Sequence, residues 1–336
     1  MSALRILIIG GTAFVGRHIT EAALDAGHEV TLFNRGQTGP ALFPSAEHLT
    51  GDRNADLSAL AGGRWDATVD VCAYLPRQVR SLAEALDDRG GQHVFISTVS
   101  VYQAPVQPGY TEDAPLAGLS DPATEEVTDQ TYGGLKVLCE RAVTELYGKD
   151  GATIVRPTYV IGPHDPTYRF TWWVDRIARG GEVIAPGDPE DPMQVIDARD
   201  MATWSVGLLE NAASGTFHAA SPAPPFGFGQ LVETVAAEVA PPGTTLTWVD
   251  SRFLRAEGED GASLPLWSEG DTDDATILTA SPAAAFSTGL SPRPLRRTVA
   301  DVAAEVRADV GGRPGIGLTA DREAELLARW RRPLAD

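Results

Sequence analysis

A tyrosine and a lysine four residues apart could form a proton-transfer pair. In the segment TYGGLKVLCE (131–140), which we expect to be helical, Tyr132 and Lys136 would lie one turn apart on the same face. A free tyrosine has a pKa of about 10, and an ammonium group at about 4 Å provides roughly the attraction needed to lower that pKa by about 3 units. We therefore interpret Tyr132 as a candidate general acid and base for interconverting a carbonyl and an alcohol. The alternative is a surface or core helix on which the pair has no chemical role.

A hydroxyl group could hold the substrate oxygen beside this pair. The segment FISTVSVY (95–102) ends an apolar strand and carries Thr98 and Ser100. Ligands of open α/β sheets bind at the carboxyl ends of the strands, so either hydroxyl could contact a substrate. Neither is specific alone, because serine and threonine are common at strand ends.

A glycine-rich turn near the N-terminus favours a phosphate-binding site. Gly10, Gly11 and Gly16 stand between the apolar run 4–10 and the helical pattern 17–27. Such a turn lets a helix N-terminus offer free N–H groups and a positive dipole end to the pyrophosphate of a dinucleotide. The alternative is a tight turn that binds nothing.

The end of the second strand indicates which dinucleotide binds. An NAD site usually has a carboxylate there for the ribose 2′-hydroxyl, whereas this chain has Asn34 followed by Arg35. A guanidinium can hold a 2′-phosphate with two hydrogen bonds, and a carboxylate would repel it. We predict NADP(H) in preference to NAD(H), with a solvated loop cation as the alternative for Arg35.

Strand and helix patterns alternate through the first half of the chain. Apolar strand patterns occur at 4–10, 28–36, 48–52, 65–74, 92–102 and 151–163. Short connections between them predict an α/β fold with a doubly wound parallel sheet. We expect a nucleotide-binding domain at 1–162 and mainly a smaller substrate-binding lobe at 163–336, some of whose elements return to the sheet.

Composition and charge narrow the class of function. The 336 residues have a net charge of −19, which opposes binding to nucleic acids and anionic membranes. The two cysteines, Cys72 and Cys139, do not suggest a disulfide framework or a zinc site, and the histidines lack metal-ligand spacing. The first apolar run is too short for a secretion signal or a membrane span. We expect a cytoplasmic protein that acts on a small molecule.

The second half holds candidate substrate residues. Arg169, Trp172 and Trp173 precede a Gly-Gly turn, and aromatic rings with arginines could bind a planar or anionic substrate. Packing of the tryptophan pair between lobe and sheet is an equal alternative. Arg199 could face the pocket or pair with Asp197 or Asp200.

Five segments in order give the chain its family resemblance. They are GGTAFVG (10–16), FISTVSVY (95–102), YGGLK (132–136), RPTYVIGP (156–163) and VIDARDMA (195–202). The chain resembles the extended short-chain dehydrogenase/reductases of the NAD-dependent epimerase/dehydratase family over essentially its whole length. The resemblance implies a Rossmann fold and, in many members, a homodimer formed through the Tyr132 helix and its neighbour.

The resemblance also implies roles for individual residues. Tyr132 and Lys136 match the catalytic pair, and the position of Tyr102 selects Thr98 over Ser100 as the catalytic hydroxyl. Ser100 stays a candidate substrate contact. The residues assigned to the cofactor are Gly10, Thr12, Ala13, Phe14, Val15, Gly16, Asn34, Arg35, Asp52, Ala73, Tyr74, Lys136, Pro157 and Val160. Among them, Asp52 is expected near the adenine, Ala73 and Tyr74 under the ribose, and Pro157 to Val160 along the nicotinamide.

Departures from the family pattern narrow the range of reactions that the chain could catalyse. Ala13 replaces the middle glycine of the turn, and Val99 and Ser100 replace the Asp-Glu pair of sugar-nucleotide 4,6-dehydratases. A dehydratase is therefore not favoured. Three functions stay open: reduction of a carbonyl or imine by NADPH, epimerisation through a keto intermediate, and a non-catalytic NADP-sensing or RNA-associated binding protein.

Overall fold

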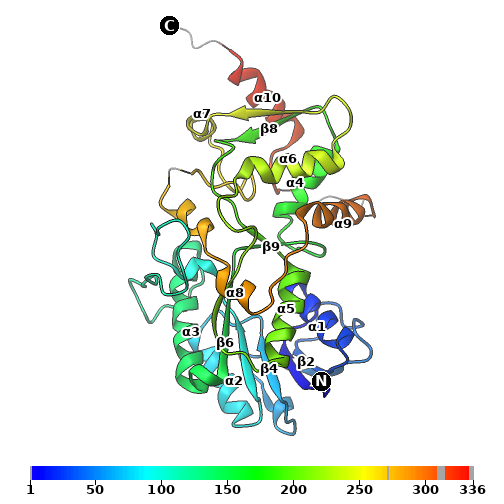
Figure 1. The fold of residues 1–336 in the computed structure, drawn as a ribbon, viewed down its shortest axis with the longest axis vertical. Coiled ribbons are helices and arrows are strands. Elements are labelled where there is room, and N and C mark those ends of the chain that lie inside the picture. The colour runs from blue at the N-terminus through cyan, green and yellow to red at the C-terminus, as the bar shows by residue number, and fades with distance from the viewer. Residues whose placement is uncertain (1, 271, 309–314, 333–336) are drawn as a thin grey trace.

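A seven-stranded parallel sheet forms one half of the molecule (Figure 1). The computed structural model describes residues 2–270, 272–308 and 315–332. The strand order is β10-β6-β5-β4-β1-β2-β3. The strands are β1 (Arg5–Ile9), β2 (Glu29–Asn34), β3 (Glu47–Thr50), β4 (Ala67–Asp70), β5 (Gln92–Ile96), β6 (Ala152–Pro157) and β10 (Gly215–Ala219). The order reverses between β1 and β4, which confirms the predicted doubly wound sheet and marks where ligands bind in such folds.

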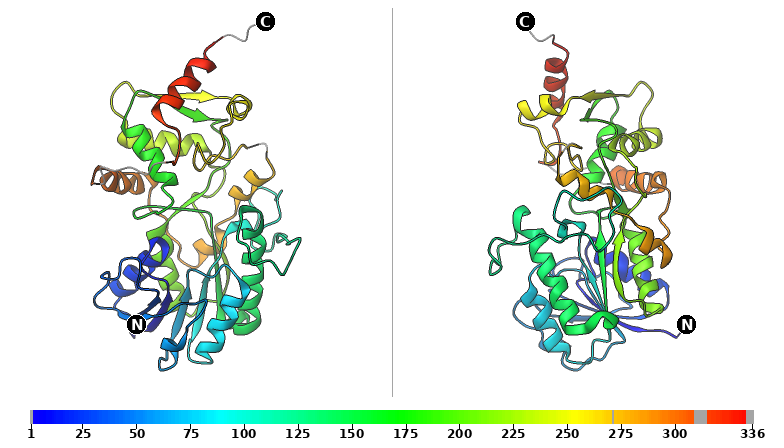
Figure 2. Two further views of the ribbon diagram at one scale, coloured as in Figure 1. Left: turned by 180° about the vertical axis from the view of Figure 1, so that it is seen from behind. Right: turned by 60° about the vertical axis from the view of Figure 1, so that its left-hand side comes forward.

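Helices cover both faces of this sheet because its central strands are apolar on both sides (Figure 2). On one face, Ile6 and Ile8 of β1 pack with α1 (Phe14–Asp25) and α5 (Ala198–Glu210). On the other face, Leu7 and Ile9 pack against α2 (Pro76–Leu86). The long α3 (Asp129–Gly151) lies beside α2 and covers β5 and β6. The sheet therefore holds α1 and α3 with their N-terminal ends near its carboxyl edge.

The remaining elements form a second lobe around its own hydrophobic core. This lobe contains two small parallel sheets, β7 (Tyr159–Ile161) with β9 (Val195–Asp197) and β8 (Glu182–Pro186) with β11 (Thr245–Val249). Its helices are α4 (Arg169–Ala178), α6 (Phe228–Val239), α7 (Ser251–Ala256), α9 (Leu295–Ala308) and α10 (Ala320–Trp330). Three short 3-10 helices, η1 (Ser58–Leu60), η2 (Val99–Val101) and η3 (Asp274–Thr279), and the helix α8 (Ala283–Ser287) complete the described elements.

The chain passes between the two halves several times. The strand predicted over 151–163 is divided: β6 lies in the large sheet, and β7 pairs with β9 instead. Pro157 ends β6, because a proline has no N–H to continue the ladder. Later in the chain, α5 packs against α1 and β10 forms the edge of the large sheet. Within the described ranges, no helix is both long and apolar enough to cross a membrane.

Candidate active site

A cavity of about 1050 Å³ lies where the carboxyl ends of the strands meet the second lobe. Thr98, Tyr132 and Lys136, predicted separately from two segments, all line it. Phe14 and Val15 of the glycine turn and Pro157 and Val160 of the β6–β7 connection line the same space. The fold therefore brings the predicted catalytic residues and part of the predicted cofactor site together.

The glycine turn has the geometry that its sequence predicts. Gly10 and Gly11 have φ values of 110° and 87°, which disfavour residues with a side chain. A Cβ atom on Gly16 would lie 2.7 Å from the backbone nitrogen of Gly11, so this position requires glycine for α1 to approach the turn. Ala13 at the N-cap makes no side-chain capping bond, and the first turn of α1 has no acidic residue. This uncapped helix start fits the pyrophosphate of a dinucleotide.

The predicted cofactor residues at the ends of β2 and β3 differ in the contacts that they make. Asn34 donates a hydrogen bond from Nδ2 to the carbonyl of Gly10 (3.1 Å) and accepts one at Oδ1 from the N–H of Gly36 (2.8 Å). Its amide therefore braces the glycine turn. Arg35 is exposed beside it and forms no ion pair with any described residue. Asp52, after β3, accepts the N–H of Asn54 at 2.9 Å.

Tyr132 is held in a chain of hydroxyl groups. Thr98 lies beside its phenol and lowers its pKa, and Thr98 Oγ1 donates to Oγ of Ser100 at 3.1 Å. The N–H of Ser100 in turn donates to Thr98 Oγ1, which caps η2. Burial raises the pKa of Tyr132 to about 12 and nearby Tyr74 adds to the rise, whereas Thr98 and Arg169 oppose it. The phenol is therefore protonated near neutral pH.

Lys136 lies on the same helix face as Tyr132, as predicted. The sequence suggested that its ammonium group acts on the phenol, whereas in the structure this group donates hydrogen bonds to backbone carbonyls. Its Nζ donates to the carbonyl oxygens of Ala73 (2.9 Å) and Ile96 (2.7 Å) and lies 4.0 Å from the ring centre of Phe95. Burial lowers the pKa of Lys136 to about 8. In this structure burial of the phenol outweighs the nearby positive charge and raises the pKa of Tyr132, so the expected fall of that pKa by about 3 units is not seen.

Tyr74 faces Tyr132 from the loop after β4. Its ring centre is 6.2 Å from that of Tyr132, and 45% of the residue is exposed although it lines the cavity. Ala73 beside it is buried and presents its carbonyl to Lys136. The loop therefore supplies both an anchor for the lysine and an aromatic wall.

Sequence reasoning missed a buried polar network behind the cavity. Glu140, one turn after Lys136, accepts Arg156 Nη2 at 2.6 Å and Ser97 Oγ at 2.5 Å. Arg156 Nη1 also donates to the hydroxyl of Tyr102 (2.5 Å), which lies 2.5 Å from Nε2 of His218. Glu140 is four residues after Lys136 on the same helix, and this spacing could have indicated that Glu140 lies near the site. Nothing in the local sequence indicated that Arg156, on a different element, would be its partner.

The lobe contributes Thr167, Arg169, Ser268 and Asp274 to the cavity wall, and Ser100 lines the sheet side. The guanidinium carbon of Arg169 lies 5.0 Å from the ring centre of Tyr159. The structure therefore supports Ser100 and Arg169 as residues that a substrate could contact.

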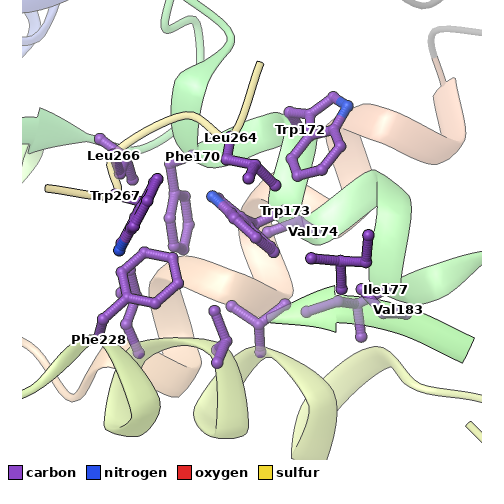
Figure 3. Packing of buried hydrophobic residues seen from close by; sticks show 14 of the residues in the cluster. Phe170, Trp172, Trp173, Val174, Ile177, Val183, Phe228, Leu264, Leu266 and Trp267 are labelled. Atoms are coloured by element: carbon purple, nitrogen blue, oxygen red, sulfur yellow. The ribbon is translucent and has the colours of Figure 1, made fainter. Parts of the chain in front are cut away.

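Three other predicted substrate residues lie elsewhere. Trp172 and Trp173 are buried in the core of the lobe, where Trp173 packs edge-on against Phe228 and donates Nε1–H to the carbonyl of Pro265 (Figure 3). The substrate role of both is a wrong prediction, because the core side of α4 requires large apolar side chains. Arg199 pairs with Asp197 (2.7 Å) and Asp301 (2.6 Å) and does not line the cavity, so its substrate role is also wrong.

The described residues offer no metal or disulfide chemistry. No group of three histidine, cysteine or acidic side chains within these ranges could hold a metal ion. Both cysteines are free, with Cys139 buried.

Comparison with known proteins identifies the family. The chain belongs to the NAD dependent epimerase/dehydratase family, whose profile matches residues 6–75 and 76–219. This membership confirms the resemblance that the sequence motifs indicated, and it defines an NAD-dependent class of protein.

The individual relatives have low sequence identity to this chain. The chloroplast stem-loop binding protein of 41 kDa b from Arabidopsis thaliana is 27% identical over 227 residues, which cover 62% of this chain and 56% of that protein. A UDP-glucose 4-epimerase from Neisseria meningitidis is 27% identical over 192 residues, 48% of this chain and 54% of that one. The chain thus spans about half the length of the curated relatives it matches.

A solved structure confirms the fold. The UDP-glucuronic acid 4-epimerase from Bacillus cereus in complex with NAD superposes with a TM-score of 0.65, covering 90% of this chain and 99% of that chain. Its sequence identity is 16%, so this likeness speaks for the fold alone.

Proposed function

We propose that this protein is an NADP(H)-dependent oxidoreductase that transfers hydride between nicotinamide and a small-molecule carbonyl or imine. The observation that carries the proposal is the shared cavity, which has Tyr132, Thr98 and Lys136 on one side and the glycine turn on another. A cofactor with its pyrophosphate at the start of α1 would reach the catalytic residues through this space.

The cofactor would supply the hydride, and the chain's own residues would handle the proton. Because the phenol of Tyr132 is protonated near neutral pH, it suits donation to the carbonyl oxygen during reduction. The hydroxyl of Thr98 would hold that oxygen, since it already contacts both Tyr132 and Ser100. The buried ammonium of Lys136 supplies positive charge at the sheet edge, where the nicotinamide ribose would lie.

The preference for NADP(H) rests on Arg35. Asn34 uses its amide within the turn, and no acidic residue takes the ribose position directly after β2. Among the residues that the structure describes, none forms an ion pair with the exposed guanidinium of Arg35, so this group could hold a 2′-phosphate.

The decisive experiment replaces the phenol. Tyr132→Phe should lower turnover by about 10²- to 10⁴-fold in a screen of ketones and imines with NADPH, because it removes the proton donor but keeps the ring. Binding of NADPH, followed by tryptophan fluorescence, should stay close to wild type. Full turnover in the variant would refute the role of Tyr132.

Epimerisation through a keto intermediate is a second candidate, supported by the similarity to a UDP-glucose 4-epimerase. It uses the same tyrosine and cofactor, but it needs a cofactor that stays bound and is oxidised at the start of each cycle. Purified protein that retains NAD and converts UDP-glucose without added cofactor would favour this candidate.

A binding role without turnover is the third candidate, since one relative is named as a stem-loop binding protein. The net charge of −19 opposes it, because RNA binding needs a basic surface. A stem-loop RNA bound at physiological salt by a protein that shows no turnover would favour this role. Cytoplasmic location and a homodimer formed through α3 stay predictions.

A further inference from the structure

A buried ion pair joins two segments at the carboxyl edge of the large sheet. Arg53 lies in the turn after β3, and Asp70 ends β4, which β1 and β2 separate from β3 in the sheet. Arg53 donates from Nη1 to Oδ1 of Asp70 (2.6 Å) and from Nη2 to Oδ2 (2.9 Å), which is a two-point contact. Asp70 is fully buried, and 9% of the Arg53 side chain is exposed. The pair therefore connects two segments that are not neighbours in the sheet.

The pair also holds the loop that follows β4, residues 71–75. Oδ1 of Asp70 accepts the N–H of Cys72 at 3.1 Å, and Nη1 of Arg53 donates to Sγ of Cys72 at 3.3 Å. Nη2 of Arg53 donates as well to the backbone carbonyl of Gln78 in the first turn of α2 (3.2 Å). The beginning of the loop and the start of the next helix are therefore bound to one guanidinium group.

Gln78 extends these contacts to the other end of loop 71–75. Its Oε1 accepts the N–H of Tyr74 (2.8 Å) and the N–H of Leu75 (3.0 Å). Its Nε2 donates to Oδ1 of Asn54 at 2.8 Å. The turn after β3, to which Asn54 belongs, therefore contacts one end of the loop directly and the other end through Gln78.

The same loop contacts the groups that would handle the proton. The carbonyl oxygen of Ala73 accepts a hydrogen bond from Nζ of Lys136 at 2.9 Å. The ring centre of Tyr74 is 6.2 Å from that of Tyr132. A displacement of the loop would therefore change the surroundings of the ammonium group and of the phenol together.

The glycine turn packs on this loop as well. A Cβ atom on Gly10 would lie 2.7 Å from Cγ2 of Val71, and one on Gly16 would lie 3.2 Å from the same atom. Sγ of Cys72 donates to the carbonyl of Ile9, at the end of β1 (3.5 Å). The loop is thus in contact with the predicted cofactor turn and with α3, and its position affects both.

Stability alone does not account for a buried ion pair at this place. Taking two charges out of water is costly, and apolar side chains of similar volume often stabilise a fold equally well. Burial opposes the ionisation of Asp70, but Arg53 holds the pKa of this carboxyl below its ordinary value, so the pair is charged near neutral pH. Apolar side chains could not accept the N–H of Cys72 or donate to the carbonyl of Gln78. The charged pair therefore adds directional bonds to the loop.

We propose that Arg53 and Asp70 are positioning residues of the active site, whose ion pair fixes loop 71–75 and thereby the carbonyl that holds Lys136. Among the described residues that line the cavity, neither member of the pair occurs, so they act through the backbone of the loop. This inference rests on the proposed function, which gives Lys136 its role, but its first test does not require turnover.

The test replaces the pair by apolar side chains, Arg53→Met together with Asp70→Val, so that no buried charge is left without a partner. Burial has the largest effect on the pKa of Lys136, and among the smaller effects Asp70 raises it and Arg53 lowers it, so the double change removes opposing charges. In protein labelled with ¹³C at the lysine side chains, Lys136 should titrate about one unit below its wild-type value, because its ammonium form loses a hydrogen bond to a fixed carbonyl. The midpoint of urea unfolding should stay close to wild type.

Turnover provides a second readout. With NADPH and a ketone or imine that the wild type reduces, kcat of the double variant should fall by about tenfold or more, because the groups around the phenol are displaced. A second variant, Gln78→Leu, removes the acceptor for the N–H groups of Tyr74 and Leu75 without changing a buried charge. It should lower the midpoint of Lys136 in the same direction, and it decides the question if the double variant does not fold.

The matched control removes an ion pair that joins α2 to α3 without contacting the loop. Arg80 and Glu145 are both exposed and lie 2.8 Å apart, and Arg80→Gln with Glu145→Gln should leave the midpoint of Lys136 and kcat unchanged. A wild-type midpoint of Lys136 in either folded test variant would overturn the inference. The proposed function fails separately if the wild type binds neither NADPH nor NADH.

Discussion

The two walls of the cavity differ in how their side chains are held. On the sheet side, Thr98, Tyr132 and Lys136 stand on strand ends and a long helix, backed by the buried Glu140–Arg156 pair. On the lobe side, Arg169, Ser268 and Asp274 come from a helix start, a loop and a 3-10 helix, and Asp274 is exposed. The comparison indicates that regular elements and a buried ion pair hold the side chains of the sheet side, whereas shorter and more exposed segments carry those of the lobe side.

The largest expected effect is on the buried pair behind the sheet side. Glu140→Gln leaves the charge of Arg156 buried without compensation, and we expect a loss of about 3 to 5 kcal/mol in the free energy of unfolding. The control is Glu145→Gln on the same helix, where the exposed pair with Arg80 should contribute little to the midpoint of urea unfolding. Equal midpoints for the two variants would show that the buried pair stabilises the protein no more than the exposed pair does.

Acid should weaken the sheet half through His93. This histidine is fully buried on β5, stacks on Tyr147 at 4.2 Å, and burial lowers its pKa to about 4. The folded-state pKa is below the unfolded value, so the stabilisation is complete above pH about 6.5 and is lost between pH 6.5 and 4, on the order of 3 kcal/mol.

Urea unfolding at several pH values measures this loss. His93→Phe, which keeps a flat ring but cannot titrate, should show a smaller dependence on pH over that window. The exposed His48→Gln serves as the control and should keep the wild-type dependence. If stability depends on pH in His93→Phe as it does in the wild type, the acid sensitivity belongs to other groups.

The pKa of Lys136 can be measured directly, because the chain has two lysines, Lys136 and Lys149. In protein labelled with ¹³C at the lysine side chains, one of two signals should titrate near pH 8, since burial disfavours the ammonium form. Lys149→Arg removes the other signal and confirms the assignment. Above pH 8, kcat/KM should fall as the free enzyme loses this charge. A midpoint near the ordinary value of about 10.4 would contradict the burial argument.

The smallest expected effect is on cofactor selectivity. Arg35→Ala should weaken NADPH binding by about tenfold relative to NADH, as the loss of a charge-assisted phosphate contact predicts. Arg64→Ala, which removes an exposed arginine near Asp88, is the matched control. Equal losses for both cofactors in Arg35→Ala would remove the basis for the NADP(H) proposal.

The sequence predicted the sheet side better than the lobe side. The glycine turn and the placement of Tyr132 and Lys136 on one helix face follow from short-range spacing, which is why they could be predicted. The core positions of Trp172 and Trp173 and the ion pairs of Arg199 depend on residues far away in the chain, such as Phe228 and Asp301. No local pattern contains that information.

By itself, the sequence determined the doubly wound sheet, the family and the candidate trio of hydroxyl, phenol and ammonium. Only the tertiary structure decided that Lys136 binds the carbonyls of Ala73 and Ile96, and that burial raises the pKa of Tyr132. It also decided that Arg169 lines the cavity, whereas Arg199 pairs with Asp197 and Asp301 away from it. The reason is physical: periodicity fixes the direction of a side chain, whereas its pKa and its partners depend on the burial and the charges that distant segments bring to it.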